Sequence, residues 1–292
     1  MQLFGSVSAA AEAPCAMLED RRQCPEAASM ESARGIALGT GARASSVSSS
    51  AVAYSPAALA LGELYHLEGN VDYMAHLNTV ALGAVAVDSA TSDLGAGIAF
   101  RGFLSGDTGY SGFDGRIGLA YPFSEAFALG LSGRYIDLSH DLGEDMRSKV
   151  DGLTLDAGLR VVPTQGLQLD VAALNFLNLD SPYVPVTLTG SVAFSLAENF
   201  GVGADLLWDF TTFADPEMIV GGGLEYLAGE SMPLRIGYRF DAGREDHSIT
   251  AGVGYTDQQV GVDVSLRQQV NAPPDGESYR TRVMAGLRYH VN

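Results

Sequence analysis

The sequence predicts an all-β fold: a transmembrane antiparallel β-barrel of about 14 strands with an N-terminal plug segment. Apolar and polar residues alternate along successive segments of about ten residues, the pattern of strands with one apolar face. An even number of such strands is typical of bacterial outer-membrane barrels. No apolar run approaches the roughly 20 residues that a helix needs to cross a bilayer.

The amino-acid composition limits the classes of function that the protein could have. The chain of 292 residues carries 35 acidic and 17 basic side chains, a formal net charge of −18. This balance argues against nucleic acid, which needs a basic face, and against docking on an anionic membrane surface. Hydrophobic residues make up 47% of the chain but occur in short pieces, and 35 glycines favour tight turns and closely approaching strands.

The alternation is clear in single segments. Val260, Val262, Val264 and Leu266 share one face, and Gly261, Asp263, Ser265 and Arg267 share the other. We therefore expect Leu155, Val202 and Val262 to face lipid, and Asp156, Gly203 and Asp263 to face the lumen. Strands are expected near residues 63–73, 78–88, 93–104, 110–121, 125–138, 149–162, 166–178, 184–195, 199–212, 217–227, 232–241, 245–255, 258–268 and 278–291.

The expected connections alternate in length. Brief ones at residues 122–125, 163–166, 197–199, 229–231 and 256–258 suit periplasmic turns. Longer ones at residues 139–149 and 268–277 suit outer loops. A soluble β-sandwich does not require this asymmetry.

The N-terminal part, residues 1–61, differs from the predicted barrel of residues 62–292. Residues 1–11 lack a basic start, although their small residues resemble the end of a signal peptide. Cys15 and Cys24 are expected to form a disulfide, which fits an oxidising periplasm; the alternative is two free thiols in a mobile arm. Residues 35–60 are small and weakly charged, so they could thread a lumen as a plug, or else hang as a disordered tail.

Two motifs carry a family resemblance. Residues 284–292 resemble the C-terminal β-signal of outer-membrane barrels, with Tyr289 and Val291 on the lipid-facing side. The segment Ser55, Pro56, Ala57, Ala58, Leu59, Ala60 resembles the Asn-Pro-Ala-Gly-Leu-Ala motif that ends the N-terminal hatch of the FadL family of fatty-acid transporters and of PorV-like barrels. Ser55 replaces the Asn and Ala58 the Gly. The resemblance implies a barrel of 14 strands, although FadL transporters are longer and build a ligand site from large outer loops.

No catalytic set is expected. The five histidines are scattered without metal-ligand spacing, and no nucleophile lies beside a base, so neither an enzyme, a metal site nor a cofactor is predicted. The acidic residues around His140 and Asp141 lack the register of a calcium-binding loop and suit a solvated loop better.

Charged residues on the predicted inner face are the candidate functional residues. They could line a polar channel or grip the plug, or they could pair with one another and hold a closed barrel together. The candidates are Arg101, Arg116, Arg134, Asp156, Arg160, Asp170, Asp205, Asp209, Arg235, Arg239, Asp263 and Arg267, joined on the same face by Arg282 and Arg288.

The leading functional hypothesis is a FadL-like protein of the bacterial outer membrane for passive passage of a small hydrophobic solute. Its partners would be outer-membrane lipid and that solute, and no nucleic acid. The alternative is a PorV-like barrel that does not transport but anchors or docks envelope proteins of a secretion, motility or surface-assembly machine.

Overall fold

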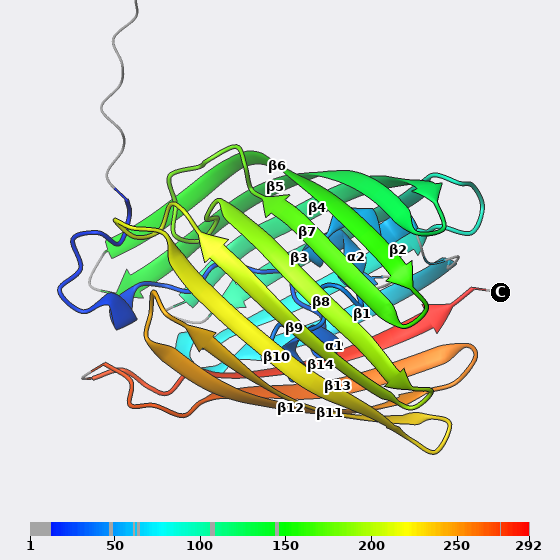
Figure 1. The fold of residues 1–292 in the computed structure, drawn as a ribbon. Coiled ribbons are helices and arrows are strands. Elements are labelled where there is room, and N and C mark those ends of the chain that lie inside the picture. Colours follow the sequence, from blue (N-terminus) through cyan, green and yellow to red (C-terminus); the bar gives the residue numbers. More distant parts are fainter. Residues whose placement is uncertain are drawn as a thin grey trace, which may run out of the picture.

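A computed structural model describes residues 13–46, 49–60, 62, 65–105, 109–143, 146–274 and 276–291. Its strands form one closed antiparallel barrel, in which each strand pairs with its sequence neighbours and β1 pairs with β14 (Figure 1). The predicted antiparallel barrel of 14 strands is confirmed, whereas the predicted N-terminal plug stays a prediction. The strands are β1 (Tyr65–Met74), β2 (Thr79–Asp88), β3 (Gly95–Ser105), β4 (Gly109–Ser124), β5 (Phe127–Gly143), β6 (Met146–Thr164), β7 (Leu167–Leu174), β8 (Thr187–Ala197), β9 (Phe200–Asp209), β10 (Glu217–Ala228), β11 (Met232–Asp241), β12 (Asp246–Thr256), β13 (Val260–Gln269) and β14 (Thr281–His290).

The outer face is apolar and the inner face polar, because side chains alternate along each strand. On β13, Val262 and Val264 are 39% and 44% exposed, whereas Asp263 and Arg267 are each 5% exposed. Leu155 and Val202 are half-buried, and the neighbouring Asp156 and Gly203 are buried. A soluble protein rarely exposes so continuous an apolar surface, but a barrel in lipid requires one.

The barrel has two unlike ends. β14 finishes and β1 begins at the C-terminal end, where residues 125–126, 198–199 and 229–231 make brief connections. We call the opposite end the loop end, since it carries the connections at residues 175–186, 210–216 and 270–280. β4, β5 and β6 are the longest strands and reach furthest toward it.

Two expectations about the loop end were wrong. Most of residues 139–149, expected as a loop, belongs to β5 and β6, which pair as far as Gly143 and Met146. Conversely, β7 ends at Leu174 instead of continuing to residue 178. Asn175 takes a positive φ of 55° there, which turns the chain out of the sheet.

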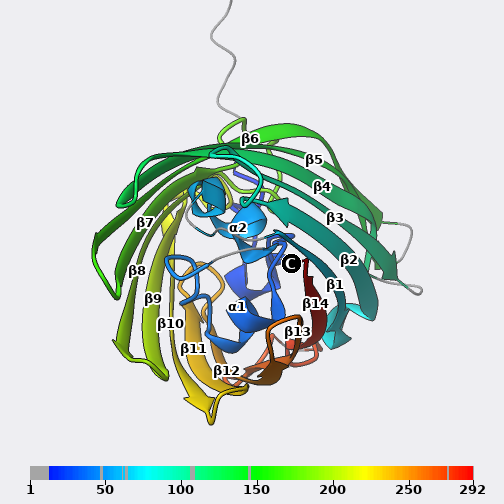
Figure 2. The same cartoon turned by 90° about the vertical axis from the view of Figure 1, so that its right-hand side faces the viewer.

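The helical elements belong mostly to the N-terminal part. They are η1 (Arg21–Gln23), α1 (Ala33–Ala37), α2 (Ser49–Tyr54) and η2 (Pro56–Ala60), and η3 (Ala75–Leu77) lies in the β1–β2 connection. Viewed along the barrel, α1 and α2 are surrounded by the strands (Figure 2). Among the described residues, no helix is long and apolar enough to span a bilayer. Residues 1–11, expected to hold a signal-peptide remnant, lie outside the described part.

Candidate functional site

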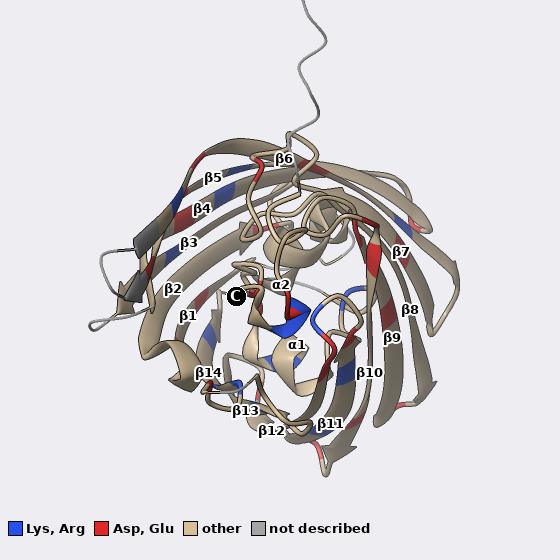
Figure 3. Cartoon of the chain, turned by 90° about the vertical axis from the view of Figure 1, so that its left-hand side faces the viewer, with Lys and Arg blue, Asp and Glu red and all other residues tan. Residues whose placement is uncertain are grey.

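The barrel interior and the chain inside it form the candidate site. We call residues 28–46 and 49–60 the lumenal segment; nearly all of them are buried. They lie within the ring of strands in both end views (Figures 2 and 3). The chain therefore runs from the loop end, through the lumen, to the start of β1 at the C-terminal end.

Arginines of the barrel wall hold the backbone of the lumenal segment. Arg101 donates to the carbonyl oxygens of Ser29 and Glu31, at 2.9 and 2.8 Å. Arg160 donates to the carbonyl of Arg43 at 2.6 Å and also to that of Ser46. Arg116 and Arg134 reach the carbonyls of Ala53 and Ala28 in the same way. A non-strand segment buried in a barrel needs such partners for its polar backbone groups.

The same arginines pair with wall carboxylates, so the charges of the inner face are largely matched. The paired side chains are buried except for that of Glu26, which is partly exposed, and hydrogen-bonded ion pairs are the form in which buried charge is tolerated. The pairs that involve predicted inner-face residues include Arg134–Asp114 at 2.8 Å, Arg267–Glu26 at 2.8 Å, Arg239–Asp241 at 3.0 Å, Arg160–Asp170 at 3.1 Å, Arg116–Asp156 at 3.4 Å, Arg101–Asp72 at 3.4 Å, Arg43–Asp205 at 3.8 Å and Arg235–Asp263.

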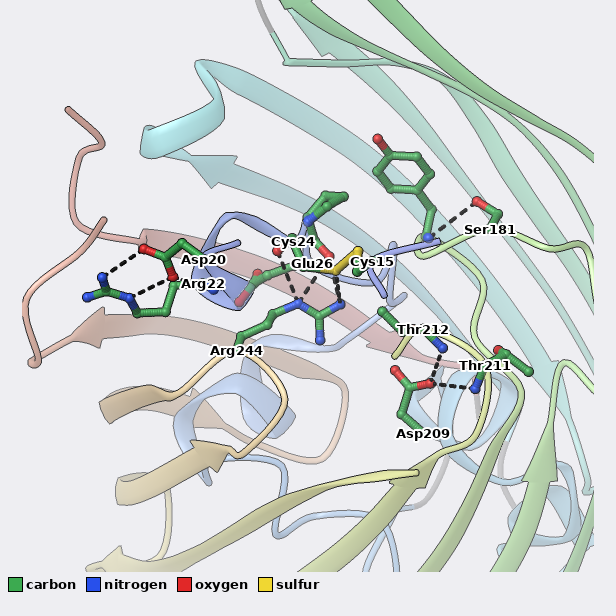
Figure 4. The surroundings of a disulfide bond; sticks show 12 residues. Cys15, Asp20, Arg22, Cys24, Glu26, Ser181, Asp209, Thr211, Thr212 and Arg244 are labelled. Atoms are coloured by element: carbon green, nitrogen blue, oxygen red, sulfur yellow. Dashed lines mark hydrogen bonds and ion pairs between the residues drawn. A yellow bond between two sulfur atoms is a disulfide. The ribbon is translucent and has the colours of Figure 1, made fainter. Parts of the chain in front are cut away.

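Asp209 has a different role. Its carboxylate accepts from the backbone N–H groups of Thr211 and Thr212, at 3.1 and 3.0 Å (Figure 4). It thus stabilises the turn after β9.

Sequence reasoning missed several members of this network. Asp72 and Asp114 share the inward side of their strands, so the alternation could have revealed them. Glu26, Glu31 and Arg43 belong to the N-terminal part, and no local pattern indicates their partners across the lumen.

Glycines let the lumenal segment touch the wall backbone. A Cβ added to Gly203 would lie 1.9 Å from the carbonyl oxygen of Gly41, and one on Gly221 would lie 1.8 Å from that of Gly39. Any side chain at either wall position would displace the segment, so the two backbones meet only because these residues are glycines.

The hatch-like motif at residues 55–60 lies at the C-terminal end of the lumen. Ser55, Ala57, Ala58 and Leu59 are at most 1% exposed, and Pro56–Ala60 form η2. A Cβ on the wall residue Gly130 would lie 2.3 Å from the carbonyl carbon of Pro56. The small side chains of the motif therefore fit a close contact with the wall.

The predicted disulfide is present, and it closes a loop at the loop end of the barrel. We call residues 13–27 the cap loop. Cys15 and Cys24 are bonded, and both pack against Phe213. Arg244 donates to the carbonyl of Pro25 at 2.6 Å, and Cys15 donates to that of Thr212 at 2.9 Å (Figure 4). These bonds fasten the cap loop to two connections of the barrel.

Glu26 links the cap loop to the wall electrostatically. Burial raises the pKa of its carboxyl, but Arg267, Arg239 and Arg280 outweigh burial and hold the pKa well below its usual value. Glu26 also borders a cavity of about 90 Å³ between the N-terminal part and the wall, beside Tyr54, Arg116 and Tyr183. Such a space can hold several waters or a small organic molecule.

Apolar side chains line the inner wall on both sides of the charged layer. Toward the loop end, Phe103, Tyr110 and Leu138 belong to one buried cluster. Toward the C-terminal end, Val87 and Ala120 pack against the lumenal segment in another. The layer between them holds Arg101, Arg116, Arg134 and their carboxylates.

No protein-family model and no curated protein matches the chain. Solved structures do match over nearly their whole length. The toluene transporter TbuX of Ralstonia pickettii has a TM-score of 0.66 and 13% identity, covering 90% of this chain and 98% of its own. The toluene transporter TodX of Pseudomonas putida has a TM-score of 0.65 and 13% identity, covering 91% and 99%. A Pseudomonas aeruginosa FadL homologue has a TM-score of 0.62 and 12% identity, covering 89% and 97%. The fold of this chain is therefore that of the FadL-type barrels.

Proposed function

We propose that the chain is a channel of the bacterial outer membrane that passes small hydrophobic molecules, with the lumenal segment as its plug. The observation that carries this proposal is the segment held inside a barrel of FadL type by wall arginines. Solutes can cross only where that segment leaves room or moves.

The charged layer sets the main barrier for an apolar solute. A neutral molecule that enters from the loop end would first meet the apolar side chains of Phe103 and Tyr110, which are buried in this structure. Further passage would disturb buried ion pairs such as Arg134–Asp114, which are costly to leave unmatched. Movement of the lumenal segment is therefore the expected gating step.

The structural neighbours favour passage over docking, because TbuX and TodX are toluene transporters. The docking role stays a prediction. It would be supported if the protein co-purified with envelope proteins and passed no solute.

Location is tested by fractionation. Native expression with a signal peptide should place the protein with outer membranes, and its gel mobility should change on boiling, because folded barrels resist the detergent at room temperature. Recovery in the soluble fraction without detergent would contradict the membrane location.

The plug is tested by deleting residues 1–50. The barrel should still fold, since its strands pair without that segment, and its conductance to ions should rise in planar bilayers. Conductance equal to that of the intact protein, together with proteolytic loss of the segment from the intact protein, would refute the plug.

The solute class is tested by uptake. Bacteria that express the intact protein in their outer membrane should take up dilute toluene faster than bacteria that lack it, and glucose no faster. A faster uptake of glucose with unchanged uptake of toluene would assign a polar solute instead.

A further inference from the structure

Two histidines face each other across the seam that closes the barrel. His66 on β1 and His290 on β14 are direct cross-strand partners at the C-terminal end. Their ring centres are 5.8 Å apart, and the ring planes are inclined by 49°. The two histidines lie on the first and last strands, far apart in the sequence. A short metal-ligand motif in the sequence therefore cannot indicate the pair.

Three of the four ring nitrogens of the pair lack hydrogen-bond partners among the described residues. His66 is fully buried, yet neither of its ring nitrogens has a hydrogen-bond partner among the described residues. The Nδ1 of His290 is likewise buried without a partner there. Buried polar atoms are normally satisfied, so two unsatisfied imidazoles at one point require an explanation.

We propose that His66 and His290 bind a divalent transition-metal ion, Zn²⁺ being the best fit. Zinc accepts imidazole nitrogen at about 2.0–2.1 Å, and two imidazoles in its tetrahedron have ring centres about 5 Å apart. The observed separation is within a small side-chain rotation of that arrangement. The proposal is independent of whether the barrel transports a solute.

The charged groups around His66 and His290 are compatible with a bound cation. Arg288 is the nearby positive group, but its guanidinium is engaged by Asp263 at 2.6 Å. Asp257 and the inward-facing Glu68 add negative charge at the same end. His290 is half-buried, which gives an ion access from that end. The described residues contain no group of three or more metal-binding side chains, so water would complete the coordination.

A metal ion bound by the two histidines would cross-link the strands that close the barrel. It would join β1 to β14, and binding to the folded barrel alone would stabilise it by mass action. The expected consequence is a barrel whose unfolding temperature rises with zinc concentration.

The test uses the full chain folded in detergent and Zn²⁺ as the probe. Isothermal titration should show one site in the intact protein, and His66→Phe or His290→Phe should each weaken it at least tenfold. The control is His247→Phe, which removes a half-buried histidine at the loop end and should leave the affinity unchanged. Cu²⁺ bound to the intact protein should show two nitrogen ligands by electron paramagnetic resonance, and one in either variant.

If His66→Phe does not fold, the zinc affinity and the copper spectrum of His290→Phe test the proposal, because His290 is less buried and its replacement disturbs the fold less. Zinc binding that is equally strong in the intact protein and the seam variants would assign the ion to surface carboxylates and overturn the proposal. So would a titration with no binding in the intact protein.

Discussion

Arg134 shows at the scale of one residue how the interior tolerates charge. Its guanidinium donates to Asp114 at 3.1 and 2.8 Å, to Asn175 at 3.0 Å and to the carbonyl of Ala28. One side chain thus joins two wall strands, the β7–β8 connection and the lumenal segment. Removing one partner leaves the others with an unmatched buried charge.

We therefore expect Asp114→Ala to lower the free energy of unfolding by about 3–5 kcal/mol, because Arg134 remains buried without its carboxylate. Urea titration of the folded barrel in lipid vesicles measures this. The control is Asp151→Ala, which removes a carboxylate 3.8 Å from the half-exposed Lys149 and should cost about 1 kcal/mol or less. Equal costs would mean that the Arg134 pair is solvated.

The lipid-facing side chains give a second prediction. Val264 lies at the middle of β13 and points outward, whereas Val262 lies nearer the C-terminal end. Arginine should cost about 2–4 kcal/mol at Val264 and less at Val262, because the cost falls from the bilayer midplane to its surface. The same urea titration compares the two. A larger cost at Val262 would place the midplane elsewhere, and no cost at either would refute the outward face.

At the scale of elements, the lumenal segment is held where wall glycines, which have no side chain, let it contact the backbone of the strands. Gly203→Val should displace it, because the new side chain would overlap the carbonyl of Gly41. We expect increased cleavage of the segment by added protease and a higher ion conductance. Gly190→Val is the control, since a Cβ at Gly190 meets nothing within 4 Å. Identical protection in both variants would show that this contact does not hold the segment.

The strands were largely predictable from the sequence because the alternation is local. All 14 expected strands overlap the observed ones, and errors gather at the loop end. Residues 139–149 resemble a loop because the outer side chains there, such as Ser139 and Lys149, are polar. The strands extend beyond the apolar belt of the barrel without ending. The end of β7 depends on one residue, Asn175, whose positive φ no hydrophobic pattern encodes.

The candidate site was less predictable. The inward parity of Arg134 or Asp156 follows from alternation, but the partner of each does not. Arg160 binds carbonyls of the lumenal segment, whose path through the barrel depends on the closed fold. The His66–His290 pair likewise exists only once β1 and β14 meet.

Over the whole molecule, the two signs of charge are unevenly placed. Most described arginines have side chains buried inside the barrel, where they pair with inner carboxylates. Arg21, Arg22 and Lys149 are the described basic residues whose side chains are about a third or more exposed, at 41%, 32% and 53%. Among the described residues, exposed acidic side chains lie in the connections at the barrel ends, as Glu245 and Glu277 do.

This distribution predicts the ion selectivity of an opened barrel. Acidic ends attract cations and repel anions on the approach to the lumen, because charged mouths focus the field. In the variant that lacks residues 1–50, the reversal potential across a bilayer with a potassium chloride gradient should show preference for potassium. The preference should be strong at 0.1 M salt, where charges act over about 10 Å before salt screens them, and weak at 1 M, where they act over about 3 Å.

Adding Glu245→Gln and Glu277→Gln at the loop end should reduce the preference for potassium without changing the conductance at 1 M. Selectivity for chloride would mean that the wall arginines, released from the lumenal segment, control the pore instead of its acidic ends.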